Sequence, residues 1–195
     1  MGGNKPFITF RGRTLLEWSW HLAQDFAATK NLSSPCLITH GPNLSKQLLG
    51  SYPVLDDSQI GPYRGPLQGI VAGLQACQEQ GQDWLLVLPV DMPLLQPQDL
   101  ESVKPQPNRW ATIPIIEGFL QPLVAVYHVE ALSSLQEELL RGKASPRRWA
   151  DQWANRVSQI GIKDSSRWKN INCGGDLLEL ASIDGLEART GEGDQ

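Results

Sequence analysis

The sequence predicts a single α/β domain with a doubly wound, mostly parallel sheet. Short apolar runs typical of strands alternate with segments of helical periodicity, and the run Trp84 to Leu88 is apolar at every position, as in a strand covered on both faces. A length of 195 residues with 41% hydrophobic residues is enough for one core. No stretch rich in Gly or Ser divides the chain, so we predict one domain over residues 1–184 and a disordered tail over 185–195.

The first half of the chain predicts two helices and three strands. Leu15, Trp18 and Leu22 recur at helical spacing, and Thr14 with Glu17 forms a capping-box pattern in front of them. Strands are expected near residues 35–39 and 52–55, followed by a loop over 56–66, a helix from 67 to about 81, and the apolar strand 84–88.

The second half repeats this alternation less regularly. We expect strands at residues 111–116 and 123–127, a helix from about 130 to 141, and another helix that opens near Pro146. Within it, Trp149 and Trp153 share one helix face, where packing is favoured over stacking on the ring of a ligand.

Charge and composition exclude several classes of protein. A net charge of -4 and a pI near 5.4 provide no basic surface for nucleic acid. No apolar run is long enough to cross a membrane and no signal peptide is recognisable, so we expect a cytoplasmic protein. The three cysteines and three histidines are scattered without the spacing of metal ligands.

Asp91 follows the most apolar strand and precedes Met92-Pro93, which prevents the strand from continuing. In a doubly wound sheet, ligands bind beyond the carboxyl ends of the strands. We therefore predict that Asp91 is a hard oxygen ligand for Mg²⁺, which takes one or two protein carboxylates. The alternative is a carboxylate that only caps a helix or a turn.

A second candidate is the segment Gly65-Pro66-Leu67-Gln68-Gly69 in front of a predicted helix. Glycines allow close approach of a ligand, and a helix N-terminus attracts anions. Asp57, upstream of this segment, is expected at the same edge of the sheet, where it would reach a second metal site or the base and ribose; a solvated turn is the alternative.

Two groups of basic side chains are further candidates for binding substrates. Lys5 follows small, flexible residues and could pair with a phosphate, although a surface lysine is the simpler interpretation. Arg141, Lys143, Arg147 and Arg148 form the densest basic cluster, and Ser145-Pro146 is typical of a helix start. We predict that Arg147 and Arg148 receive the acceptor substrate, with a solvated connection between helices as the alternative.

These pieces together resemble the molybdenum cofactor guanylyltransferases. The resemblance spans residues 1 to about 182, in five elements that follow the family's order: Met1-Gly2-Gly3-Asn4-Lys5, Leu55-Asp56-Asp57-Ser58 with Gly65-Pro66-Leu67-Gln68-Gly69, Pro89-Val90-Asp91-Met92-Pro93, Gln121-Pro122-Leu123 and Asn170-Ile171-Asn172.

The resemblance implies a Rossmann-like nucleotidyltransferase domain that transfers GMP from GTP to the phosphate of molybdopterin, with Mg²⁺ as cofactor and release of pyrophosphate. Carried over position by position, Lys5 and Asp91 are the catalytic residues, Lys5, Asp57 and Asp91 contact GTP, and Asp91 holds the metal. Proteins that handle the molybdenum cofactor, or enzymes that accept it, are further expected partners.

The chain departs from the family pattern at its start. The family's first strand and most of its glycine-rich loop have no counterpart before Met1, and we expect the upstream genomic sequence to encode them in frame. Alternative functions are a relative that uses CTP or a sugar or polyol phosphate, and a catalytically silent molybdopterin-binding protein. Titration with GTP and CTP would separate them.

Overall fold

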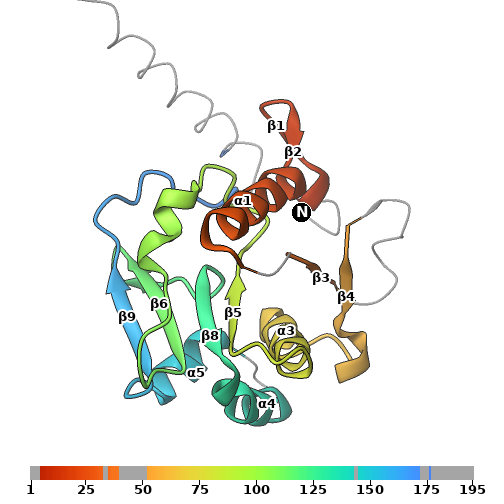
Figure 1. The fold of residues 1–195 in the computed structure, drawn as a ribbon, viewed down its shortest axis with the longest axis vertical. Helices are drawn as coiled ribbons and strands as arrows, with labels where there is room; N and C mark the ends of the chain where they lie inside the picture. Colours follow the sequence, from red (N-terminus) through yellow and green to blue (C-terminus); the bar gives the residue numbers. More distant parts are fainter. Residues whose placement is uncertain (1–4, 33–34, 40–51, 143–144, 172–175, 177–195) are drawn as a thin grey trace, which may run out of the picture.

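A computed structural model of the chain describes residues 5–32, 35–39, 52–142, 145–171 and 176, so the predicted tail lies outside the described residues (Figure 1). The helices are α1 (Leu15–Lys30), α3 (Pro66–Glu79), α4 (Leu132–Leu140) and α5 (Pro146–Gln152). The strands are β1 (Thr9–Phe10), β2 (Arg13–Thr14), β3 (Leu37–Thr39), β4 (Val54–Asp56), β5 (Trp84–Val87), β6 (Ala111–Ile116), β7 (Phe119–Leu120), β8 (Ala125–His128) and β9 (Val157–Gly161). Short 3₁₀ helices are η1 (Lys5–Phe7), η3 (Asp57–Ile60), η4 (Pro97–Ser102) and η5 (Val129–Ala131).

The larger sheet is covered by helices on both faces. Along β5, Leu85 and Val87 pack against the core cluster that contains residues of α3, α4 and α5. Trp84 and Leu86 point to the opposite cluster, which contains Leu22 and Phe26 of α1. This alternation confirms the α/β class and explains why β5 is apolar at every position.

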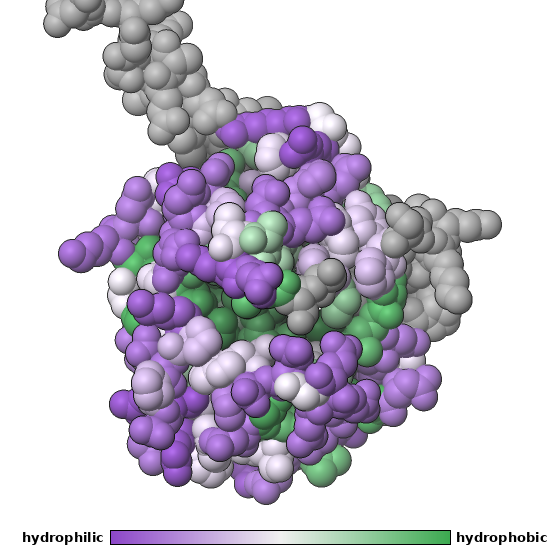
Figure 2. Space-filling model, viewed as in Figure 1, coloured by the Kyte–Doolittle hydropathy of each residue, from purple (hydrophilic) through white to green (hydrophobic). Residues whose placement is uncertain are grey.

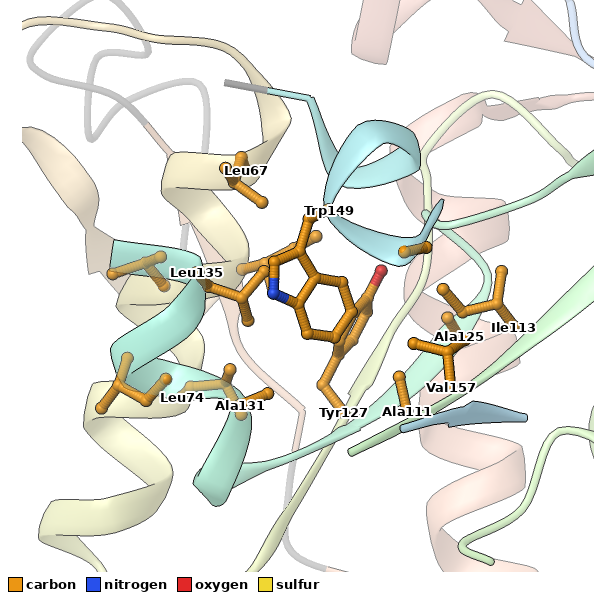
Figure 3. Close-up of a cluster of buried hydrophobic side chains, with 14 of the residues drawn as sticks. Leu67, Leu74, Ala111, Ile113, Ala125, Tyr127, Ala131, Leu135, Trp149 and Val157 are labelled. Atoms are coloured by element: carbon orange, nitrogen blue, oxygen red, sulfur yellow. The ribbon is translucent and has the colours of Figure 1, made fainter. Parts of the chain in front are cut away.

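The first core cluster is centred on Trp149 of α5, which is wholly buried (Figure 3). Its indole ring lies against the ring of Tyr127 from β8, with 5.9 Å between ring centroids. The indole Nε1 donates a hydrogen bond of 2.9 Å to Ser134 Oγ in α4, so its polar atom is satisfied. Packing, as predicted for Trp149, therefore joins α5 to the sheet and to α4.

The expectation of a mostly parallel sheet is wrong for the described strands. The larger sheet has the order β5-β8-β6-β7, with β9 paired to β6, and only the β6–β9 pair is parallel. The cause is connection length: β6, β7 and β8 follow one another through short turns, which leave no room for the crossover that parallel strands need. Hydrophobic periodicity does not report strand direction.

A second, two-stranded sheet pairs β3 with β4 in parallel. α3 lies against both sheets, and Gly73 marks the contact, since a Cβ added there would lie 2.7 Å from Leu85 Cδ2 of β5 and 3.1 Å from Ile38 Cδ1 of β3. A glycine at this position lets the helix approach both strands closely. Along the chain, α3 leads from the carboxyl end of β4, through η3, to the start of β5.

The start of α1 matches its predicted cap. The Glu17 N–H donates to Thr14 Oγ1 at 3.2 Å, and the Thr14 N–H donates to a Glu17 carboxylate oxygen at 2.6 Å. The Thr14 hydroxyl donates to the same carboxylate oxygen at 2.9 Å, and the hydrogen bonds from the Thr14 N–H and hydroxyl lower the pKa of Glu17. None of the described helices is long and apolar enough to cross a membrane.

Candidate active site

Asp91 lies in a turn beyond the carboxyl end of β5. The strand ends at Val87, because Pro89 has no N–H to donate to a neighbouring strand. The backbone around Asp91 is held on two sides: Ser19 Oγ of α1 donates to the Pro89 carbonyl at 3.0 Å, and the Ile171 N–H donates to the Asp91 carbonyl at 2.8 Å. The Asp91 carboxylate thus has a well-defined place outside the ladder, although the strand ends earlier than the apolar run implied.

Lys5 meets Asp91 across 86 positions of sequence. Lys5 Nζ donates to Asp91 Oδ2 at 2.7 Å, and the side chains are 25% and 21% exposed. Lys5 begins η1, and the Ile8 carbonyl just after it accepts from the Leu15 N–H at 2.9 Å, which ties this segment to the start of α1. Since a partly exposed ion pair stabilises a fold by at most about 1 kcal/mol, this pair is more informative about the site than about stability.

Asp57 is the most buried of the three candidate side chains, with 3% of its surface exposed. It begins η3, and the preceding Asp56 is the cap, since its Oδ1 accepts from the Ser58 N–H at 2.9 Å. One Asp57 carboxylate oxygen lies 3.9 Å from the position that a Cβ on Gly69 would occupy. The carboxylate therefore lies over the first turn of α3, where the helix dipole is positive.

The segment in front of α3 has the backbone that its sequence predicts. Gly65 is the N-cap with φ of 83°, a left-handed value that favours glycine, and Pro66 opens the helix. The structure thus brings Lys5 and Asp91 into contact and puts Asp57 beside the start of α3.

Both arginines that the sequence suggested for an acceptor site have partners within the fold. Arg148 binds Glu138, whose side chain is only 2% exposed, through Nε at 2.6 Å and Nη2 at 2.5 Å. Arg147 lies over the Phe119 ring at 5.4 Å from its centroid. Ser145 caps α5 as expected. Arg148 therefore neutralises a buried carboxylate, and Lys143 lies outside the described residues.

Sequence reasoning missed two supports of the site. Gln68 is a wholly buried polar side chain within an apolar helix face, and that contrast could have marked it. The backbone hydrogen bond from Ile171 to Asp91 could not be predicted, because contacts between main-chain atoms of distant segments do not depend on residue type.

Figure 2 shows a hollowed band with visible apolar side chains between α1 above and α3 and α4 below.

Two open hollows, of about 450 Å³ and about 390 Å³, lie elsewhere on the described surface. One lies between α3 and α4 and includes Gln75 and Gln136. The other includes Trp84 and His128, at the amino-terminal end of β5. Both are remote from the strand end that carries Asp91, and neither is lined by the candidate residues.

Comparison with known proteins identifies the family. A model of the MobA-like NTP transferase domain matches residues 1–157 of the 195. The chain belongs to this family. Among curated relatives, the molybdenum cofactor guanylyltransferase of Pseudomonas syringae pv. tomato is 32% identical over 176 residues, covering 88% of this chain and 82% of the relative. The probable molybdenum cofactor guanylyltransferase of Bacillus licheniformis is 28% identical, covering 92% of this chain and 89% of the relative.

Solved structures agree on the fold of this MobA-like chain. The molybdopterin-guanine dinucleotide biosynthesis protein A of Archaeoglobus fulgidus superposes with a TM-score of 0.70 at 20% sequence identity, covering 94% of this chain and 92% of the other. At this identity the likeness shows the fold, which is that of the nucleotidyltransferases.

Proposed function

We propose that this MobA-like protein transfers GMP from GTP to the terminal phosphate of molybdopterin and releases pyrophosphate. The family match and the names of the curated relatives support the reaction class and the two substrates. The observation in the structure that supports it best is the Lys5–Asp91 pair at the carboxyl end of β5, with 2.7 Å between Nζ and Oδ2.

The reaction requires charge neutralisation and alignment rather than a base. An oxygen of the acceptor phosphate attacks the α-phosphorus of GTP, and the bond from that phosphorus to the bridging oxygen breaks, so that pyrophosphate leaves. The attacking phosphate is already ionised, so no proton has to be removed from it. Lys5 Nζ then acts as a positive charge for phosphate oxygens, which is the main requirement of phosphoryl transfer.

The Asp91 carboxylate fits a hard divalent cation. It is partly exposed at the strand end, and a carboxylate has a second oxygen that can bind a cation while Oδ2 accepts from Lys5. The described residues contain no group of three or more potential metal ligands, and Mg²⁺ needs only one or two carboxylates, with water and phosphate oxygens as its other ligands. A bound Mg²⁺ would stabilise negative charge on the phosphates during transfer.

Asp57 completes the proposed GTP site. Its buried carboxylate next to the first turn of α3 suits a hydrogen-bond acceptor for the base or ribose better than a phosphate contact, because two anions would repel each other. We place the reaction in the cytoplasm, with acceptor enzymes or cofactor-handling proteins as downstream partners.

The test is a transfer assay with purified protein, molybdopterin, Mg²⁺ and either GTP or CTP, followed by measurement of pyrophosphate and of the dinucleotide product. We expect product with GTP and little with CTP. A preference for CTP would replace the proposed donor. Binding of molybdopterin without turnover with either nucleotide would indicate the catalytically silent alternative.

A further inference from the structure

Gln68 is a polar side chain in a position where α3 is otherwise buried and apolar. It is wholly buried, as is Leu67 beside it, and Ile70 and Val71 of the next turn are buried too. A buried amide is costly unless it is hydrogen-bonded. Its partners therefore explain why a glutamine is tolerated there.

The side-chain amide of Gln68 forms hydrogen bonds with three backbone groups of the loop that precedes α3. Its Nε2 donates to the carbonyls of Asp57 and Gly61, both at 3.0 Å, and its Oε1 accepts from the Arg64 N–H at 2.8 Å. Both ends of the loop from residue 57 to residue 64 are thus bound to one side chain of the helix. Arg64 has a second anchor, since its Nη1 donates to the Leu139 carbonyl of α4 at 2.8 Å.

This loop carries a residue of the proposed nucleotide site and leads into another part of it. Asp57 is at one end with its carboxylate over the first turn of α3, and Gly65, with its left-handed φ, follows the other end. The bond from Gln68 to the Asp57 carbonyl fixes the backbone that directs this carboxylate. A small change in that backbone would move the carboxylate away from the helix N-terminus.

We propose that Gln68 is a positioning residue for GTP binding: it fixes the 57–64 loop, and thereby the Asp57 carboxylate, before the nucleotide arrives. The inference rests on the proposed function. An apolar side chain of similar size would fill the same volume but would leave the carbonyls of Asp57 and Gly61 without this donor. The loop would then sample other conformations, and GTP would have to order it.

Two variants separate the two ends of the loop. Gln68→Leu removes all three hydrogen bonds at similar volume. Gln68→Glu keeps an acceptor for the Arg64 N–H but, when ionised, has no proton to donate to Asp57 or Gly61. Leu135→Ala in α4 is the control, because Leu135 is wholly buried in the core but has no place in this loop.

The experiment combines hydrogen–deuterium exchange of the protein without nucleotide with titration of GTP and Mg²⁺ and with steady-state kinetics. For Gln68→Leu we expect faster exchange over residues 57–64, a rise in the Kd and KM for GTP of about tenfold, and a kcat within about threefold of wild type. For Gln68→Glu we expect faster exchange near residues 57–61 with the Arg64 amide still protected. Leu135→Ala is expected to lower the Tm and to leave the Kd for GTP unchanged.

Unchanged exchange over 57–64, or an unchanged Kd for GTP in Gln68→Leu, would overturn the positioning role. An equal weakening of GTP binding in Leu135→Ala would also overturn it, because the effect would then follow overall stability. A wild-type protein that binds no GTP would overturn the proposed function and this inference together, whereas failure of the inference alone requires a wild type that binds GTP.

Discussion

Replacing Asp91 by asparagine separates a catalytic carboxylate from a structural one. Asp91→Asn keeps the size of the side chain and removes its charge. The ion pair of Asp91 with Lys5 contributes little to stability, because both side chains are more than one fifth exposed and solvent screens their charges. Loss of the pair should therefore cost at most about 1 kcal/mol, or about 2–4 °C in Tm for a domain of this size.

As a metal ligand and phosphate-site residue, Asp91 should matter far more. The loss of a group that stabilises developing charge typically lowers turnover by two to three orders of magnitude, about 3 to 4 kcal/mol on the barrier. We expect Asp91→Asn to show this loss in the transfer assay, and to need more Mg²⁺ for half-maximal rate. The expected changes in activity and in stability thus differ several-fold in free energy.

Asp99 provides a matched control. It also forms an ion pair, in which Arg167 Nη2 lies 2.6 Å from Asp99 Oδ1, and its side chain is only 8% exposed. Asp99→Asn should lower the Tm at least as much as Asp91→Asn while leaving turnover intact. Unchanged turnover of Asp91→Asn at limiting Mg²⁺ would refute the metal assignment, and equal losses of turnover in the two variants would show that the assay reports stability.

Three further predictions concern the rest of the fold. Arg148→Ala should lower stability by about 2 to 3 kcal/mol, measured by urea unfolding, because it leaves the buried Glu138 without its closest cation; a change within error would contradict this. Arg147→Ala should cost below about 1 kcal/mol but weaken molybdopterin binding in a titration while GTP binding stays constant; equal effects on both ligands would exclude an acceptor role. Gly73→Ala should lower the Tm despite the better helix propensity of alanine, since the new Cβ would lie 2.7 Å from Leu85 Cδ2; a raised Tm would show that the leucine moves aside at low cost.

Features encoded locally were predictable from the sequence. The cap of α1 follows from Thr14 and Glu17, which interact within one turn, and β6 has the bounds that its apolar run predicts. The direction of the strands was not predictable from periodicity, because a two-residue repeat is the same in parallel and antiparallel pairs. The hairpin of β1 and β2 was also missed; it turns through Arg11 and Gly12 with φ of 50° and 78°, and an arginine is a weak signal for such a turn.

In the candidate site, too, local features were predictable and contacts between distant segments were not. The strand end at Asp91 was predictable because an apolar run followed by proline is a local pattern. The contact of Asp91 with Lys5 depends on packing between segments 86 positions apart, and only the family resemblance indicated both residues. The pairing of Arg148 with Glu138 could not be predicted either, since the burial of Glu138 is a property of the folded chain. That Arg147 and Arg148 receive the acceptor stays a prediction.

The backbone hydrogen bond between Ile171 and Asp91 has a consequence for when the site can form during protein synthesis. Lys5, Asp91 and Ile171 come from the early, middle and late parts of the described chain, yet they meet at one strand end. While the protein grows on the ribosome, the early lysine and the later aspartate have no complete site until the segment that contains Ile171 has emerged. A nucleotide that binds only the complete site can stabilise the finished protein but cannot help a nascent chain to fold.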